Sequence, residues 1–138
     1  MSKSPRGAKK QKRKKKHPIA RRERLLFVCT FNISRSVTAE HLFLNSDRYE
    51  ARSAGVHPAA PVSASAELIA WADRVVVMEE HHAATLRQRF PEVVGEKTLT
   101  CLNIPDEYQP GEERLVLILW ERLGGTLKLD REIPGGQP

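Results

Sequence analysis

Cysteine is scarce in this chain of 138 residues, which contains only Cys29 and Cys101. The sequence also lacks a secretory leader and any apolar run of the roughly 20 residues that a membrane-spanning helix needs. These absences favour the reducing environment of the cytoplasm. A cluster at metal-ligand spacing is missing as well: His81 and His82 are adjacent, would diverge on a helix, and are expected at the surface. The sequence therefore predicts neither a metal nor another cofactor.

Acidic residues are almost absent from positions 1–24, which hold 12 Lys or Arg and one Glu, a net charge of +11. The remaining positions hold 11 basic and 16 acidic residues, a net charge of −5, so the basic excess belongs to this segment. A run such as residues 9–16 cannot bury a core, and residues 1–24 are expected to form a disordered basic tail. Such a tail either contacts polyanions such as nucleic acid or merely aids solubility, and no membrane insertion is expected.

The rest of the sequence alternates between apolar runs typical of buried strands and segments with helical spacing. Four parallel strands with right-handed crossovers would form one α/β domain over residues 25–123, a flavodoxin-like sheet with helices on both faces. Residues 124–138, which are rich in Gly and Pro, are expected to form a flexible tail. We expect strands at 24–28, 49–53, 74–78 and 97–102, and helices at 34–45, from 63 or 65 to 71, from 79 or 80 to 90 and at 112–123. Pro91 is expected to end the third of these helices.

The most informative segment is residues 29–36, Cys-Thr-Phe-Asn-Ile-Ser-Arg-Ser, which follows an apolar strand and precedes a helix. Backbone N–H groups of a tight loop and the N-terminus of a helix together favour an anion the size of phosphate. In such a cradle Cys29 would attack phosphorus, and the planar fork of Arg35 would hold two phosphate oxygens. The alternative is that Cys29 is simply a small buried hydrophobe at the end of a strand.

The other residues of this loop have predicted roles of their own. Asn32 tolerates the left-handed backbone that the loop needs, and the hydroxyl of Ser36 can donate to the thiolate. Ser34 or Ser36 could also cap the following helix. The predicted phosphate-binding loop is completed by Thr30, Phe31, Ile33 and Ser34.

This loop, continued by residues 37–40, resembles the signature of the low-molecular-weight protein tyrosine phosphatase family. The likeness continues in the family's order through residues 52–55, 72–78 and 104–108, and it is greatest to the short bacterial branch known as predicted protein tyrosine phosphatases. The resemblance implies a metal-independent phosphatase that hydrolyses tyrosine or aryl phosphates through a cysteinyl-phosphate. Its partner would be a phosphotyrosine protein or a small aryl phosphate.

By the same resemblance, a late loop supplies the general acid, which protonates the leaving oxygen and later activates water. Asp106 matches the family's acid, and Tyr108 matches the aromatic residue two positions beyond it. Glu107 replaces the usual Pro, so either carboxylate could be the acid, and we expect Asp106. Tyr108, with Phe31 and His57, is a candidate for the wall of the substrate pocket.

Two departures from the family narrow the expected activity. Ser34 stands where many members carry a second Cys, and Cys101 is expected to be an inert core thiol, so the disulfide relay of an arsenate reductase is not favoured. Ile33 stands where the related arginine-phosphate phosphatases carry Thr, which favours an aromatic phosphate. Two alternatives from other classes remain, a non-catalytic module that binds phosphoproteins and a nucleic-acid-associated protein that acts through the basic tail.

Overall fold

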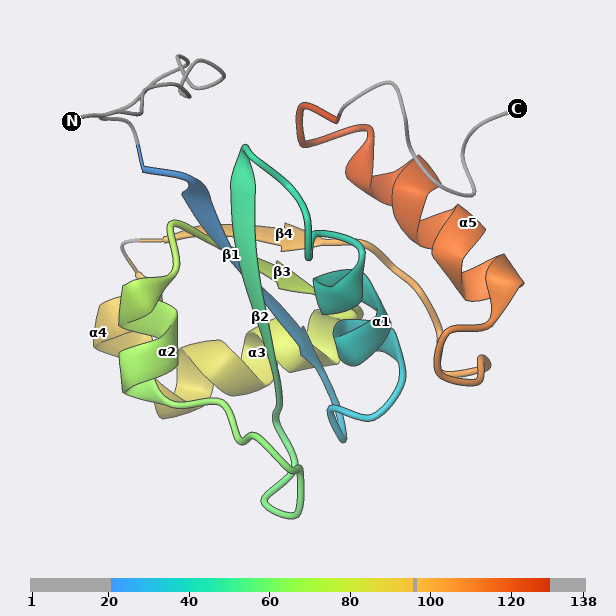
Figure 1. The fold of residues 1–138 in the computed structure, drawn as a ribbon. Coiled ribbons are helices and arrows are strands. Elements are labelled where there is room, and N and C mark those ends of the chain that lie inside the picture. Colours follow the sequence, from blue (N-terminus) through green and yellow to red (C-terminus); the bar gives the residue numbers. More distant parts are fainter. Residues whose placement is uncertain (1–20, 96, 130–138) are drawn as a thin grey trace, which may run out of the picture.

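The computed structural model describes residues 21–95 and 97–129 (Figure 1). Its four strands form one parallel sheet, as the sequence predicted, and their order is β2-β1-β3-β4. The elements are β1 (Glu23–Cys29), α1 (Arg35–His41), β2 (Tyr49–Gly55), α2 (Ala66–Trp71), β3 (Arg74–Val77), α3 (Glu80–Arg89), α4 (Pro91–Val94), β4 (Thr98–Cys101) and α5 (Glu113–Leu123).

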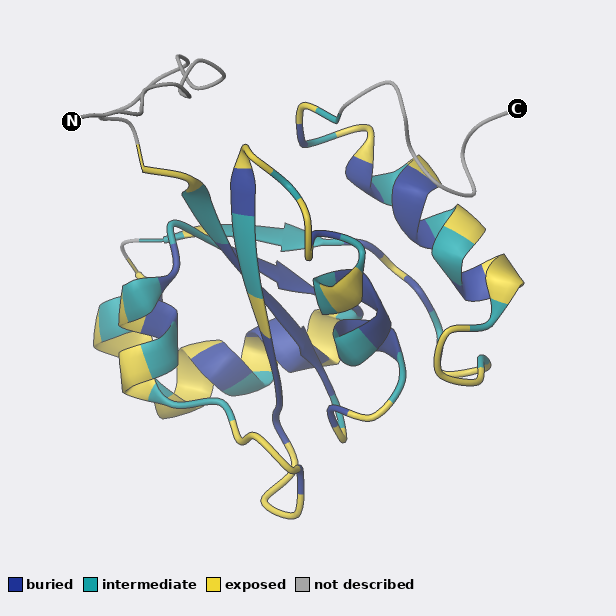
Figure 2. Ribbon diagram, viewed as in Figure 1, coloured by how far each residue is buried: buried dark blue, intermediate teal, exposed yellow. Residues whose placement is uncertain are grey.

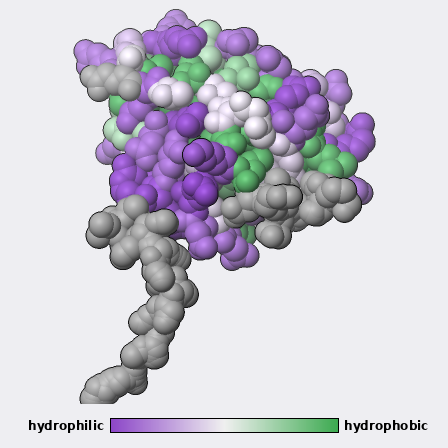
Figure 3. Space-filling view, turned by 90° about the horizontal axis from the view of Figure 1, so that it is seen from above, coloured by the Kyte–Doolittle hydropathy of each residue, from purple (hydrophilic) through white to green (hydrophobic). Residues whose placement is uncertain are grey.

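Helices cover both faces of the sheet, and the side chains of β1 show why. Successive side chains of a strand point to opposite faces, and those of β1 are apolar in both directions. Leu25 and Phe27 belong to the core beneath α1 and α5, whereas Leu26 and Val28 belong to the core beneath α2, α3 and α4. Figure 2 shows β1 and β3 buried between the two helical layers, and Figure 3 shows that the surface seen from above is mainly hydrophilic.

The helices follow the predicted ranges, with two differences. α1 ends at His41, before the expected boundary at Asn45. Pro91 was expected only to end a helix, but it also opens the short helix α4, where its missing N–H costs no hydrogen bond. Among the described residues, no helix combines the length and the apolarity needed to cross a bilayer.

Both ends of the described chain pack more closely than the sequence suggested. Residues 23 and 24 lie in β1, and Arg21 pairs with Asp73 at 2.9 Å, so residues 21–24 do not belong to a free tail. Leu127 is buried, and the N–H of Lys128 donates to the hydroxyl of Tyr49 at 2.9 Å. The flexible segment predicted from residue 124 is therefore packed as far as residue 129. The predictions for residues 1–20 and 130–138 lie outside the described residues.

The sheet order places the two predicted functional loops at one edge. The chain passes from β1 to β2 on one side and then returns to β3 on the other side, which makes the carboxyl end of β1 a topological switch point. Cys29 is the last residue of β1. The loop that carries Asp106 leaves the carboxyl end of β4 at the same edge, where the N–H of Ile104 donates to the carbonyl of Met78 at 2.8 Å.

Candidate active site

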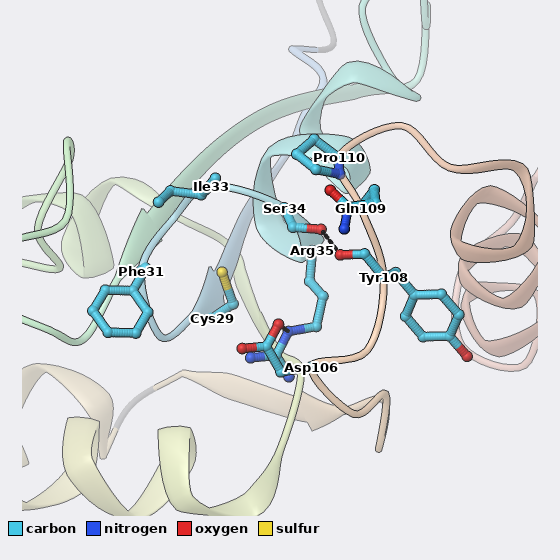
Figure 4. A pocket seen from close by; sticks show the side chains of 9 residues that line it. All are labelled: Cys29, Phe31, Ile33, Ser34, Arg35, Asp106, Tyr108, Gln109 and Pro110. Carbon is cyan, nitrogen blue, oxygen red and sulfur yellow. Dashed lines mark hydrogen bonds and ion pairs between the residues drawn. The ribbon is translucent and has the colours of Figure 1, made fainter.

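A cavity of about 250 Å³ opens at this edge of the sheet. Figure 4 shows Cys29 beside the guanidinium of Arg35, with Asp106, from the loop after β4, drawn next to that guanidinium. The structure thus brings together the three residues to which the sequence assigned catalytic roles. The cavity is lined by Cys29, Phe31, Ile33, Ser34, Arg35, Asp106, Tyr108, Gln109 and Pro110.

The Cys29 sulfur shares a hydrogen bond with the hydroxyl of Ser36. The Sγ atom lies 3.0 Å from the Oγ of Ser36, and the side-chain amide of Asn32 donates to that same Oγ at 2.9 Å. The Ser36 oxygen accepts from Asn32 through one lone pair, and its own proton can point toward the sulfur. Ser36 is therefore placed within hydrogen-bond reach of the nucleophile expected at Cys29, and its role as a donor to that sulfur stays a prediction.

The loop between Cys29 and Arg35 is held by a polar network and by the end of β2. Asn32 is buried at a left-handed φ of 56°, and its amide also donates to Ser53 at 3.0 Å. The backbone N–H groups of residues 56 and 57 donate to the carbonyls of residues 29 and 30. A Cβ at Gly55 would lie 2.5 Å from the carbonyl oxygen of Thr30, so only glycine allows this close approach.

The guanidinium of Arg35 is buried and anchored through one of its nitrogens. Its Nη1 donates to Glu79 at 2.5 Å and to the carbonyl of Ile104 at 2.8 Å. Its Nε is buried without a hydrogen-bond partner among the described residues, and it lies 3.8 Å from a carboxylate oxygen of Asp106. A buried cationic donor of this kind, in the same cavity as a thiol, suits an oxygen of a bound anion.

Glu79 was not predicted as a site residue, yet it supplies the carboxylate partner of Arg35. Burial alone would raise the pKa of Glu79, but the hydrogen bond and the charge of Arg35 outweigh it and leave this pKa below its usual value. Glu79 is therefore ionised at neutral pH. It fixes the orientation of a guanidinium that is only 2% exposed.

The expectation that His82 lies at the surface is wrong. His82 is fully buried at the start of α3, whereas His81 is exposed. The N–H of Glu79 donates to its Nδ1 at 3.0 Å, so the proton of the neutral ring is on Nε2, which donates to the hydroxyl of Thr30 at 2.8 Å. Burial, together with the nearby charges of His81 and Arg35, lowers the pKa of His82 to about 4. His82 is a neutral tether between α3 and the predicted phosphate loop.

The same turn contains a group that could be taken for a cation site. One ligand atom each from Glu79, His81 and His82 lies within 4.8 Å of the other two. The sequence offered no convincing third ligand for the two histidines, and Glu79 fills that position in space. However, the Glu79 carboxylate is paired with Arg35, and both ring nitrogens of His82 have hydrogen-bond partners. These contacts orient the two loops of the cavity.

The predicted wall residues divide into two groups. The ring of Phe31 packs on that of His57, with centroids 4.5 Å apart, and Phe31 and Ile33 remain 43% and 57% exposed. Tyr108 was expected to stack on a substrate ring. Its ring points away from Cys29 (Figure 4) and packs 5.1 Å from the guanidinium of Arg114. One apolar wall is therefore formed by the loop after β1, and the ring of Tyr108 serves the packing of α5.

The two carboxylates of the late loop differ in their position relative to the cavity. Asp106 lines the cavity, whereas Glu107 is not among the residues that line it. Asp106 is thus the carboxylate that shares the cavity with Cys29, and its role as the general acid stays a prediction. The loop is fastened to the start of α1 by three hydrogen bonds: Arg35 donates to the carbonyl of Ile104, the Ser34 hydroxyl donates to the carbonyl of Tyr108, and the N–H of Gly111 donates to the hydroxyl of Thr38.

No protein-family model matches the chain, and no curated protein sequence matches it. Solved structures do match. The YwlE arginine phosphatase from Geobacillus stearothermophilus is 25% identical at a TM-score of 0.55, over 75% of this chain and 91% of that one. A low-molecular-weight protein tyrosine phosphatase from T. tengcongensis is 25% identical at a TM-score of 0.55, over 76% and 99%. The tyrosine phosphatase Wzb from Escherichia coli K30, solved with phosphate, is 20% identical at a TM-score of 0.59, over 75% and 95%.

Proposed function

We propose that this chain, a phosphatase of the low-molecular-weight protein tyrosine phosphatase family, hydrolyses aryl phosphomonoesters through a cysteinyl-phosphate formed on Cys29. The observation that carries the proposal is the buried Nε of Arg35, which has no hydrogen-bond partner among the described residues and shares one cavity with the Cys29 thiol and the Asp106 carboxylate. A nucleophile, an anion-binding cation and a proton donor are the three groups that this reaction needs.

In the first step, Arg35 and the loop amides hold the phosphoryl group while the Cys29 sulfur attacks phosphorus. The sulfur–phosphorus bond forms as the bond to the ester oxygen breaks, and Asp106 gives its proton to the departing phenolate oxygen. The cationic Arg35 offsets the charge on the phosphoryl oxygens, so the step requires no metal ion.

In the second step, the Asp106 carboxylate takes a proton from a water molecule, and the water oxygen attacks phosphorus. The sulfur–phosphorus bond breaks and inorganic phosphate forms. The Ser36 hydroxyl, 3.0 Å from the sulfur, stabilises the departing thiolate by donating a hydrogen bond. Asp106 ends the cycle protonated, as it began.

The rim of the cavity supports an aromatic ester. Phe31 and Ile33 are large apolar side chains that remain about half exposed, and both line the cavity beside its polar floor. An aryl ring would cover this apolar surface as the phosphate enters. The likeness to the YwlE arginine phosphatase makes phosphoarginine the second candidate. Ile33 argues against it, because an apolar side chain offers no hydrogen-bond acceptor to a guanidinium.

Hydrolysis of p-nitrophenyl phosphate in the presence of EDTA tests the proposal. We expect turnover by the wild type, none by Cys29→Ser, and a loss of roughly 10²–10⁴ in kcat for Asp106→Asn, the usual scale for a missing general acid. Cys101→Ser is the matched control, because Cys101 lies on β4 and burial raises the pKa of its thiol. It should keep the wild-type rate.

A second assay compares a phosphotyrosine peptide with a phosphoarginine peptide. We expect the phosphotyrosine peptide to be the better substrate, and the opposite order would favour the second candidate. A wild-type protein that binds phosphate but turns over neither ester would instead be a phosphate-binding module.

A further inference from the structure

The hydroxyl of Ser34 has an unusual partner. Ser34 is the N-cap residue of α1, where a serine hydroxyl ordinarily accepts a hydrogen bond from an N–H of its own helix. It makes no such bond here. The hydroxyl turns away from α1 and donates instead to the carbonyl of Tyr108 at 2.8 Å, 74 residues along the chain (Figure 4). The capping role considered for Ser34 is therefore replaced by a contact between the two functional loops.

Asp106 depends on such contacts for its position. It is 60% exposed, and its recorded ionic contact, at 3.8 Å from the Nε of Arg35, is too long for a hydrogen bond. Residues 102–112 contain no helix or strand that would hold the carboxylate in place. The backbone of this loop is held instead at Ile104 by Arg35, at Tyr108 by Ser34 and at Gly111 by Thr38.

Two of these contacts lie two residues from Asp106, and both come from the loop that surrounds the nucleophile: Arg35 holds Ile104, and Ser34 holds Tyr108. The side chains of Asn32 and Ser36, in contrast, direct their hydrogen bonds within that loop or to Ser53. Arg35 also pairs with Glu79 and is the cation expected to bind the phosphoryl group, whereas the side chain of Ser34 donates to Tyr108 alone among the described residues. Ser34 is thus the residue through which the support of Asp106 can be altered without removing the anion-binding guanidinium.

We propose that Ser34 is a positioning residue whose hydroxyl, by holding the carbonyl of Tyr108, keeps Asp106 aimed at the leaving oxygen. This inference rests on the proposed function. It separates two roles of the residue: the backbone N–H of Ser34 belongs to the phosphate loop, whereas its side chain serves the general acid. Loss of the hydroxyl should then lower kcat more for a substrate whose leaving group depends more on protonation.

A series of aryl phosphates whose phenols increase in basicity, from dinitrophenol to unsubstituted phenol, tests this separation. For Ser34→Ala we expect kcat to fall by less than about 3-fold for the most acidic phenol and by roughly 10-fold or more for the most basic. Asp106→Asn should show the same trend more steeply. The double variant should be no slower than Asp106→Asn alone, because Ser34 acts through Asp106. The inhibition constant of inorganic phosphate should stay within about 2-fold of the wild type.

Two further variants make the test specific to the hydroxyl. Ser34→Thr keeps an O–H donor, and its kcat should depend on the basicity of the phenol as the wild-type kcat does. Ser65→Ala removes the hydroxyl that caps α2, where Ser65 accepts from the N–H of Leu68 at 3.1 Å. It should lower the melting temperature while leaving the dependence on the phenol unchanged, which separates lost stability from a misplaced acid.

Three outcomes would overturn the inference. In the first, Ser34→Ala lowers kcat equally for every phenol of the series. In the second, the double variant is slower than Asp106→Asn by the full factor that Ser34→Ala causes alone. In the third, Ser34→Thr is as impaired as Ser34→Ala. Failure of the proposed function is visible separately, because the wild type would then hydrolyse no member of the series, or Cys29→Ser would match the wild type.

Discussion

At the scale of single residues, the site is built from side chains whose partners are far away in the sequence. Arg35 and Glu79 are 44 residues apart, and Thr30 and His82 are 52 residues apart. The positions of Cys29, Arg35 and Asp106 could be predicted because a local loop pattern and a family resemblance point to them. Glu79 and His82 could not be predicted in this way, because nothing local distinguishes a carboxylate that orients Arg35 from one that faces solvent. The spacing of three residues between them, which is that of a capping box, was the available signal.

His82 leads to a prediction about pH and stability. Its pKa of about 4 in the folded protein lies below the ordinary value of 6.5, so between these values the unfolded chain binds the extra proton. Acid therefore favours unfolding, and this contribution to stability, on the order of 3 kcal/mol, is present above pH 6.5 and is lost as the pH falls toward 4. Melting temperatures measured from pH 7.5 to 4.5 should show the loss.

The matched variants assign this pH dependence to one ring. His82→Gln should be less stable at neutral pH, because it loses the contacts to Glu79 and Thr30, and its melting temperature should vary less over this pH range. His81→Gln changes the exposed neighbour, and its melting temperature should fall with pH nearly as steeply as that of the wild type. An unchanged slope in His82→Gln would show that another group is responsible.

At the scale of elements, the alternation of strands and helices could be predicted because buried parallel strands are continuous apolar runs and the helices between them are not. α4 could not, because a segment of four residues gives too short a pattern and Pro91 can either end a helix or begin one. Residues 124–129 were expected to be flexible from their glycines. They pack because Leu127 reaches the core, which is a tertiary contact that composition does not reveal.

The close contact between β2 and the phosphate loop leads to a prediction for Gly55. A methyl group there would lie 2.5 Å from the carbonyl oxygen of Thr30 and 3.0 Å from the backbone nitrogen of Asn32. Both are backbone atoms, so the loop itself must move. We expect Gly55→Ala to weaken inhibition by inorganic phosphate and to lower kcat/KM by roughly 10²-fold, since an error of about 1 Å in the placement of reacting groups has this effect.

Gly125→Ala is the control for this substitution. Its added methyl group would meet nothing closer than the carbonyl oxygen of Arg122 at 3.6 Å, which is ordinary contact. The variant should therefore keep the wild-type activity and phosphate inhibition. A Gly55→Ala protein with normal phosphate inhibition would mean that the loop tolerates the displacement.

At the scale of the whole molecule, the sheet order explains why the predicted catalytic residues meet. In an open parallel sheet the loops at the carboxyl ends of the strands lie along one edge, and the switch point at β1 opens a crevice there. Cys29 and Asp106 come from two such loops, although they are 77 positions apart. This convergence could be predicted from the order of the elements alone. The contacts that Ser34 and Thr38 make with the late loop needed the three-dimensional structure.

The uneven distribution of charge leads to the last prediction. Residues 1–20 carry nine Lys or Arg and no Asp or Glu, whereas residues 21–138 carry a net charge of −3. A deletion should stop at residue 20, because Arg21 pairs with Asp73 at 2.9 Å beside the first strand. The residues that line the cavity lie between 29 and 110, so the truncated protein should hydrolyse a small aryl phosphate within about 2-fold of the full chain. Binding to heparin should be lost, because in the full chain it depends on released counterions and falls steeply with salt. Equal heparin binding by the two proteins, measured from 50 to 200 mM salt, would place the polyanion contact on the folded domain instead.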